Sequence, residues 1–205
     1  MKSAKPQFAF EHALQYWFGN GVNAAEIAQA KSEIWWGKST SIDNDIRERF
    51  AVLRECVIKD ELEEWAQTGR GRLALILVVD QFSRNIFRDT AEAFRYDYMA
   101  QEWCLSGLDA GANLELTAIE RVFFYLPLEH SESRVDQMRS VALYTELYDS
   151  APPQEQKLFA SYLEFARQHH AIIERFGRFP HRNRALQRNS TPEELEFLQT
   201  PKSSF

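Results

Sequence analysis

The chain has 205 residues, of which 44% are hydrophobic and 13% aromatic, so it can bury a sizeable core, most simply as one domain over residues 1–205. A net charge of −6 and a pI near 5.5 argue against a nucleic-acid partner, because phosphate binding relies on clustered Lys and Arg. The longest uncharged apolar run, residues 73–79, is too short to cross a bilayer, and the first residues lack the apolar stretch of a signal peptide. The composition therefore predicts a soluble cytoplasmic protein without a membrane partner.

The two cysteines give no sign of a cross-link or a metal site. Cys56 and Cys104 are far apart in sequence, lie in helical patterns and belong to no CxxC motif. This arrangement is typical of buried thiols in a reducing compartment. We therefore expect both residues to be reduced.

Helical periodicity begins near the N-terminus. Apolar residues at helical spacing predict a helix over residues 6–18, which a Gly-Asn-Gly segment ends. Residues 24–30 fit a short helix, and the Trp-Trp-Gly segment at 35–37 looks like an aromatic plug in a loop. Either Ser41 or Asp43 is suited to cap a long helix that follows and runs to about residue 57.

The most informative stretch is residues 73–88. A Thr-Gly-Arg-Gly break at 68–71 precedes a predicted helix over about 72–86, whose first half is purely apolar. Its second half carries polar residues at helical spacing, so that Asp80 shares a face with Arg84, and Gln81 with Asn85. Charge placed this close to a core needs partners, and this junction is therefore a candidate site.

The second half of the chain is also helical. We expect Thr90 to cap a helix to about residue 105, and residues 116–126 to form another that Pro127 kinks or ends. Further helices are predicted over 135–148 and 154–176, the latter closed by Gly177. Thr191 and Glu194 form a capping box that opens a short last helix. No period-2 run demands a strand, so the sequence predicts an all-α array of seven to nine antiparallel helices.

Six strings of residues, in this order, resemble an uncharacterised, mainly bacterial family, domain-of-unknown-function family 924. They are YWFG at 16–19, DQFSRNIFR at 80–88, YLPLEHSE at 125–132, DQMRSVALY at 136–144, RFGRFPHRN at 175–183 and STPEELEFL at 190–198. Ser83 stands where family members often carry Pro, and Ser is compatible with a continuing helix. The resemblance implies a fold similar to tetratricopeptide-repeat proteins, in which antiparallel helix pairs stack into a curved layer. It implies no activity.

Polar residues gather in four of these strings, and in each they adjoin Phe, Leu or Pro. We therefore expect them to converge from different helices on one partly buried place. The cationic and amide side chains would form a pocket for an anionic small molecule or a peptide carboxylate, because Arg offers a planar fork to carboxylate or phosphate oxygens. The ligand-binding candidates are Arg84, Asn85, His130, Arg178, His181, Arg182 and Asn183.

Two other interpretations of the same residues stay open. In an enzyme, Glu129 or Asp80 would act as a general base with His130 as its proton partner, and nearby arginines would stabilise developing negative charge. In an architectural network, the arginines would only satisfy carboxylates and helix-end carbonyls. No cofactor or metal is expected, because the chain has no HExxH motif and no paired CxxC motifs.

Overall fold

The computed structural model describes residues 8–201 and 203, and this part of the chain is helical, without strands. Nine of the α-helices described are six residues or longer, which confirms the predicted all-α class. None of the described helices is long and apolar enough to cross a membrane. In chain order the α-helices are α1 (Phe10–Phe18), α2 (Ala24–Trp36), α3 (Thr40–Ile58), α4 (Gly69–Ile76), α5 (Ser83–Ile86), α6 (Asp97–Asp109), α7 (Ala118–Glu129), α8 (Arg134–Ser150), α9 (Gln156–Phe176) and α10 (Pro192–Phe197).

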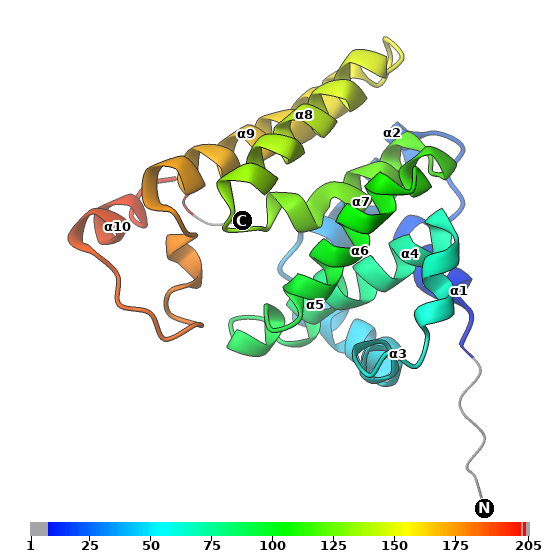
Figure 1. Cartoon of the computed structure of the whole chain (residues 1–205), viewed down its shortest axis with the longest axis horizontal. Coiled ribbons are helices and arrows are strands. Elements are labelled where there is room, and N and C mark those ends of the chain that lie inside the picture. Colours follow the sequence, from blue (N-terminus) through cyan, green and yellow to red (C-terminus); the bar gives the residue numbers. More distant parts are fainter. Residues whose placement is uncertain (1–7, 202, 204–205) are drawn as a thin grey trace, which may run out of the picture.

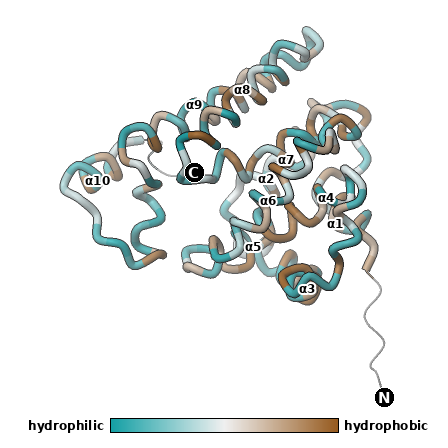
Figure 2. The backbone as a smooth tube through the Cα atoms, in the orientation of Figure 1, coloured by the Kyte–Doolittle hydropathy of each residue, from teal (hydrophilic) through white to brown (hydrophobic). Residues whose placement is uncertain are grey.

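The helices form two groups, which α7 connects (Figure 1). In the first group α4 contacts α1, α6 and α7, while in the second α8 and α9 lie side by side as a long antiparallel pair. Helix α7 also packs against α8 and α9. The C-terminal segment that carries α10 extends beyond the end of α9 and is mostly hydrophilic (Figure 2). Polar side chains on this segment and at the helix ends can therefore meet between the two sets of helices.

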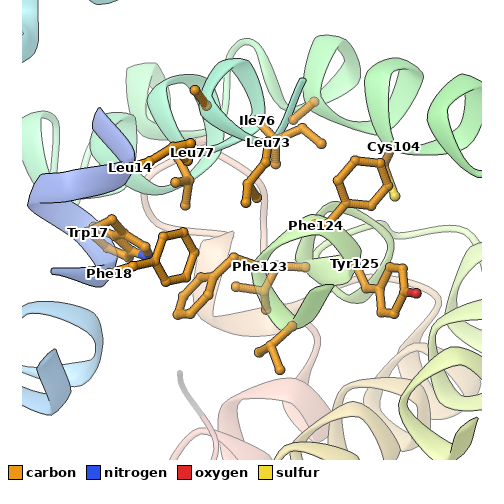
Figure 3. Close-up of a cluster of buried hydrophobic side chains, with 14 of the residues drawn as sticks. Leu14, Trp17, Phe18, Leu73, Ile76, Leu77, Cys104, Phe123, Phe124 and Tyr125 are labelled. Carbon is orange, nitrogen blue, oxygen red and sulfur yellow. The ribbon is translucent and has the colours of Figure 1, made fainter. Parts of the chain in front are cut away.

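The main hydrophobic cluster lies between α1, α4 and α7 (Figure 3). Trp17 has no exposed surface, and its ring centroid lies 5.5 Å from those of Phe82 and Phe123. Every residue of the apolar run 73–79 is at most 1% exposed. A helix segment buried on all sides is expected at the centre of a helical protein. The site candidates that follow this run are thereby attached directly to the buried, close-packed core.

Helix α4 begins earlier than the sequence predicted. The Thr-Gly-Arg-Gly segment does not separate two helices as a four-residue loop. Thr68 is the N-cap of α4, and its side chain accepts a hydrogen bond from the Gly71 N–H at 3.1 Å. Both glycines of this segment therefore lie in the first helical turn. A Cβ atom on Gly71 would lie 2.2 Å from the carbonyl oxygen of Trp65, so only glycine fits where the chain approaches itself this closely.

A π-helical turn, Leu77–Phe82, joins α4 to α5 where the apolar run meets the polar residues. The predicted helix over 72–86 is therefore continuous but not regular, since the π turn forms i→i+5 hydrogen bonds. Arg84 still reaches Asp80, as their spacing predicted: the Nη1 and Oδ1 atoms are 2.8 Å apart. Such turns occur frequently at functional sites in helical proteins.

Two expectations for the N-terminal third are wrong. Helix α2 does not stop near residue 30, and both tryptophans lie in its last turn instead of in a loop. Helix α3 has Ser39 as its N-cap, so neither Ser41 nor Asp43 caps it. Asp43 lies inside the helix, where its carboxylate accepts two hydrogen bonds from Arg88 at 2.7 Å. Long-range pairing of this carboxylate replaces the local capping role that its position suggested.

Pro127 does not end its helix, because α7 continues to Glu129. The carbonyls of the last turn receive a donor from another helix: the Gln137 amide on α8 donates to the Glu129 and Ser131 carbonyls at 2.6 and 2.7 Å. Gln137 has no exposed surface. Its side chain therefore fixes the polar end of α7 on α8 and satisfies helix-end acceptors that water cannot reach.

Helices α9 and α10 follow the sequence closely. Helix α9 ends at Gly177, whose φ of 68° is left-handed, and Thr191 and Glu194 form the predicted capping box of α10. The expectation that Thr90 caps a helix is wrong: Thr90 precedes a short 3₁₀ turn, its hydroxyl donates to the Phe87 carbonyl, and the helix begins only at Asp97. Both cysteines are thiols, Cys104 buried and Cys56 half-buried.

Replacing Gln137 with Met tests the interhelical cap, because Met retains the length of the side chain and removes the donor. We expect the free energy of unfolding to fall by about 2 kcal/mol, since buried carbonyls lose their partner. Urea unfolding of Gln137→Met and of the exposed Gln29→Met provides the comparison. Equal, small changes in the two variants would contradict a capping role.

Candidate functional site

A cavity of about 480 Å³ lies where α2, α5, α7, α9 and the 3₁₀ turn Pro180–Arg182 meet. This volume is in the usual range of small-molecule sites. The wall is partly aromatic, with Trp36, Phe94 and Phe165 among its members. The ionisable and polar side chains in the lining are Lys38, Gln81, Arg84, Asn85, Arg88, Asp89, Glu129, His130, Tyr144, Tyr162, His169, His181 and Arg182.

Asp80 lies directly behind this wall and has no exposed surface. Its Oδ1 atom lies 2.8 Å from Nη1 of Arg84 and 2.8 Å from Nδ1 of His130, and the Gln81 amide donates to Oδ2. Burial would raise the pKa of the carboxyl, but the Arg84 charge and His130 outweigh it and hold the pKa below its usual value. Asp80 is therefore an ionised, fully paired carboxylate that orients cavity residues without facing the cavity itself.

Arg84 is paired on both sides. Its two terminal nitrogens donate to both carboxylate oxygens of Asp97 at 2.9 and 2.8 Å, and it also binds Asp80. Burial favours loss of the guanidinium proton, yet the two carboxylates raise the pKa above its ordinary value. Asn85 is engaged too, since its amide donates to Asp43 at 2.9 Å. Both residues line the cavity, but most of their donors are already used.

Arg182 is different, because it is buried without an adequate counterion. It is 6% exposed, and its nearest carboxylate, Asp97, lies 3.7 Å away with both oxygens bound to Arg84. Its Nε atom has no hydrogen-bond partner within the described part of the chain. Burial, followed by the charge of Arg84, lowers the pKa of Arg182 to about 10. The guanidinium rests on the ring of Phe179, 4.4 Å from the centroid.

His130 is held in one orientation by Asp80. Burial and the charge of Arg84 lower the pKa of His130 despite the neighbouring carboxylate, so the ring is neutral near pH 7. A neutral ring that contacts a carboxylate through Nδ1 donates from that atom. The second nitrogen, Nε2, is then the acceptor, which is the tautomer that a general base or a hydrogen-bond acceptor for a ligand requires.

Glu129 is a buried acid on the same wall. Burial raises its pKa to about 8, although a hydrogen bond with Tyr144 opposes this shift. The Tyr144 hydroxyl, which also donates to the Val122 carbonyl at 2.7 Å, is the partner of Glu129 in this hydrogen bond. His169 lies on the other side, with Nδ1 at 3.0 Å from Oε1. Burial outweighs the hydrogen bond with Tyr144 and favours the protonated carboxyl at neutral pH.

Some of the predicted residues lie outside the cavity lining. Arg178 donates to both oxygens of Glu194 at 2.6 and 2.8 Å, and Asn183 donates to the same carboxylate. Arg178 holds the pKa of Glu194 down at about 2. This second network fixes α10 against the end of α9. Of the predicted ligand-binding residues, the structure brings Arg84, Asn85, His130, His181 and Arg182 together at the cavity.

The sequence analysis did not identify the residues of α9 and α2 that line the cavity. Tyr162, Phe165 and His169 share one face of α9 at spacings of three and four residues and all line the cavity. This pattern was visible in the sequence, but it is also the pattern of an ordinary core-facing stripe. The sequence pattern predicts Trp36 in a loop, whereas it lies in the last turn of α2.

No group of three His, Cys, Asp or Glu residues that could hold a metal ion occurs among the described residues.

Asp80 and its partner Arg84 provide a prediction with an internal control. Asp80→Asn removes one of the two carboxylates that pair the partly buried Arg84, and we expect the free energy of unfolding to fall by about 3–5 kcal/mol. Asp45 and Arg49 form a pair of the same spacing at the surface, 2.7 Å apart, so Asp45→Asn should cost less than about 1 kcal/mol. Urea unfolding measures both. A small cost for Asp80→Asn would show that the buried network contributes little to the fold.

Comparisons with known proteins identify the family of this chain but assign it no activity. A solved structure of a protein of unknown function from Agrobacterium tumefaciens is 33% identical, with a TM-score of 0.77 over 93% of this chain and 96% of that one. No curated protein matches the sequence. The profile of the family described as "Bacterial protein of unknown function (DUF924)" matches residues 13–202. The chain therefore belongs to the DUF924 family.

Proposed function

We propose that the protein binds a small anionic molecule in the 480 Å³ cavity, with Arg182 as the main anchor. The observation that carries this proposal is the incomplete pairing of Arg182, a buried guanidinium whose Nη1 lies 3.7 Å from an Asp97 carboxylate that already binds Arg84 with both oxygens. A buried charge without a counterion is costly, and an anion in the cavity would remove that cost. Arg also matches carboxylate and phosphate oxygens geometrically.

Neighbouring groups support an anion at this position. Lys38 lines the same cavity and adds a second cation, while His130, His181 and Asn85 offer further polar contacts. Burial, followed by the charge of Arg182, lowers the pKa of His181 to about 3, so it is neutral in the absence of a ligand. We leave Arg178 and Asn183 out of the ligand set because both are paired around Glu194.

The similarity of the scaffold to tetratricopeptide-repeat proteins is also part of this proposal. The antiparallel pair of α8 and α9 and its packing on α7 fit a tetratricopeptide-like arrangement of stacked helix pairs. Proteins of that kind often hold peptide carboxylates, so a peptide terminus is a second form of the same anionic ligand. The cytoplasmic location remains a prediction from the acidic composition and the cysteines.

Anion-dependent stabilisation tests the proposal. Inorganic phosphate, sulfate and succinate are titrated into the protein while the melting temperature is followed. At a concentration about tenfold above its dissociation constant, a bound anion should stabilise the native state by about 1.4 kcal/mol. We expect Arg182→Met to abolish this effect, because the variant retains the bulk of the side chain and lacks its charge.

The matched control is Arg178→Met, which removes an arginine from the same C-terminal segment but outside the cavity. It should lower the melting temperature, since Glu194 loses its partner, and leave the anion-induced shift unchanged. An anion effect that persists in Arg182→Met, or that is lost equally in Arg178→Met, would contradict the assignment. The architectural interpretation predicts no anion-induced shift in any of the proteins.

Acid–base catalysis is a second candidate function, favoured by one observation: a carboxyl with a pKa near 8 and an oriented neutral imidazole line the same cavity. Glu129 would donate a proton, His130 would accept one through Nε2, and Arg182 would stabilise negative charge on the substrate. Asp80 would then position His130 and not act as a base, because both its oxygens are paired.

The protonation of Glu129 can be measured through stability. A carboxyl whose folded pKa is raised from 4.5 to about 8 contributes stability that is fully present below pH 4.5 and lost as the pH rises to 8. Glu129→Gln mimics the protonated acid, so its stability relative to wild type should increase across this window and reach roughly 4 kcal/mol at pH 8. Urea unfolding from pH 4.5 to 8, with the exposed Glu196→Gln as control, measures the effect. A flat difference would show that Glu129 is ionised in the fold and unsuited to be an acid.

A further inference from the structure

The cavity is chemically different at its two ends. The cationic end contains Arg84 and Arg182, whose guanidinium carbons lie 5.5 and 4.9 Å from the ring centroid of Phe94. The aromatic end contains Trp36 and Tyr162, with ring centroids 6.2 Å apart. Both pairs belong to the cavity lining. A ligand that fills the cavity therefore meets charge at one end and flat apolar surface at the other.

The geometry of α9 gives the separation of these ends. His169 packs edge-on against Phe179, the ring that carries Arg182, with centroids 5.5 Å apart. Tyr162 lies seven residues earlier on the same helix, which is two turns or about 10 Å along the axis. A ligand that contacts both ends therefore has an anionic group and a ring separated by a short chain.

Two observations at the aromatic end point to a ligand. Trp36 is 52% exposed although it lies in the cavity lining, so one face of the indole is open to contact. Tyr162 is only 6% exposed, and its hydroxyl has no hydrogen-bond partner in the described part of the chain. A buried hydroxyl without a partner is unfavourable. This hydroxyl has almost no accessible surface, so a polar atom on a ligand would complete it once the Tyr162 ring shifts toward the cavity.

We infer that the cavity takes an aryl-substituted carboxylic acid, with its carboxylate on Arg182, its ring against Trp36 and a polar ring substituent bonded to Tyr162. This inference rests on the proposed anion site and specifies the class of ligand. A small molecule suits the volume of about 480 Å³. An inorganic anion would fill only the cationic end and would leave both features of the aromatic end unexplained.

Isothermal titration calorimetry with three related acids tests each contact separately. The probes are propionate, 3-phenylpropionate and 3-(4-hydroxyphenyl)propionate, titrated into the full-length protein. We expect the ring to increase affinity at least about tenfold over propionate, and the hydroxyl to add about fivefold more. Trp36→Ala should remove the gain from the ring, Tyr162→Phe only the gain from the hydroxyl, and Arg182→Met the binding of all three acids.

Leu114→Ala is the control for Trp36→Ala, because Leu114 is a large exposed apolar residue outside the cavity lining. It should bind all three acids as the wild type does. Equal affinity for propionate and 3-phenylpropionate, with both lost in Arg182→Met, would overturn the inference and leave the anion site standing. Tighter binding of the tripeptide Gly-Gly-Phe by more than tenfold would assign the cavity to a peptide terminus. If neither these acids nor phosphate bind, the anion site falls as well.

Discussion

The structure depends on one buried carboxylate. Asp80 ends the apolar run at the centre of the fold, has no exposed surface and holds Arg84 and His130 at 2.8 Å each. Because a charge in this position is tolerated only when it is paired, the packing of the core fixes the carboxylate and the carboxylate fixes its partners. The chain passes from core to polar network within a single π-helical turn, Leu77–Phe82. The cavity wall thus takes its geometry directly from the hydrophobic core.

Charged side chains in this protein divide into two kinds. Most arginines are matched to carboxylates across elements, as Arg88 is to Asp43 and Arg178 to Glu194, and these pairs determine how the helices stack. The architectural interpretation describes them well. Arg182 departs from this pattern because Asp97 already satisfies Arg84 with both oxygens. The proposed function therefore depends on how incompletely one cation is paired, and not on how many cations are present.

Two acidic residues near the cavity have opposite protonation because their surroundings differ. Asp80 and Glu129 are both buried, yet Asp80 has the Arg84 cation beside it, whereas Glu129 contacts the neutral Tyr144 and His169 and its pKa is raised further by the charge of Asp80. Burial favours the protonated form in each case, and only a nearby positive charge reverses that preference. A neutral acid and an incompletely paired guanidinium in the same lining give the cavity both a hydrogen-bond donor and a charge. That combination suits recognition of an anion and is also the minimum for acid–base chemistry.

The sequence by itself determined the helical class, the limits of α8 and α9 to within two residues, and the start of α10 with its capping box at Thr191, because these follow from local periodicity and side-chain capping. It also located the junction at Asp80, where apolar and polar residues meet. Tertiary structure alone decided which polar residues share a site. Arg178 and Arg182 are four residues apart in one basic segment, yet one is neutralised by Glu194 and the other faces the cavity. Pairing between charges depends on distances of a few ångströms between elements far apart in the chain, which no local pattern encodes.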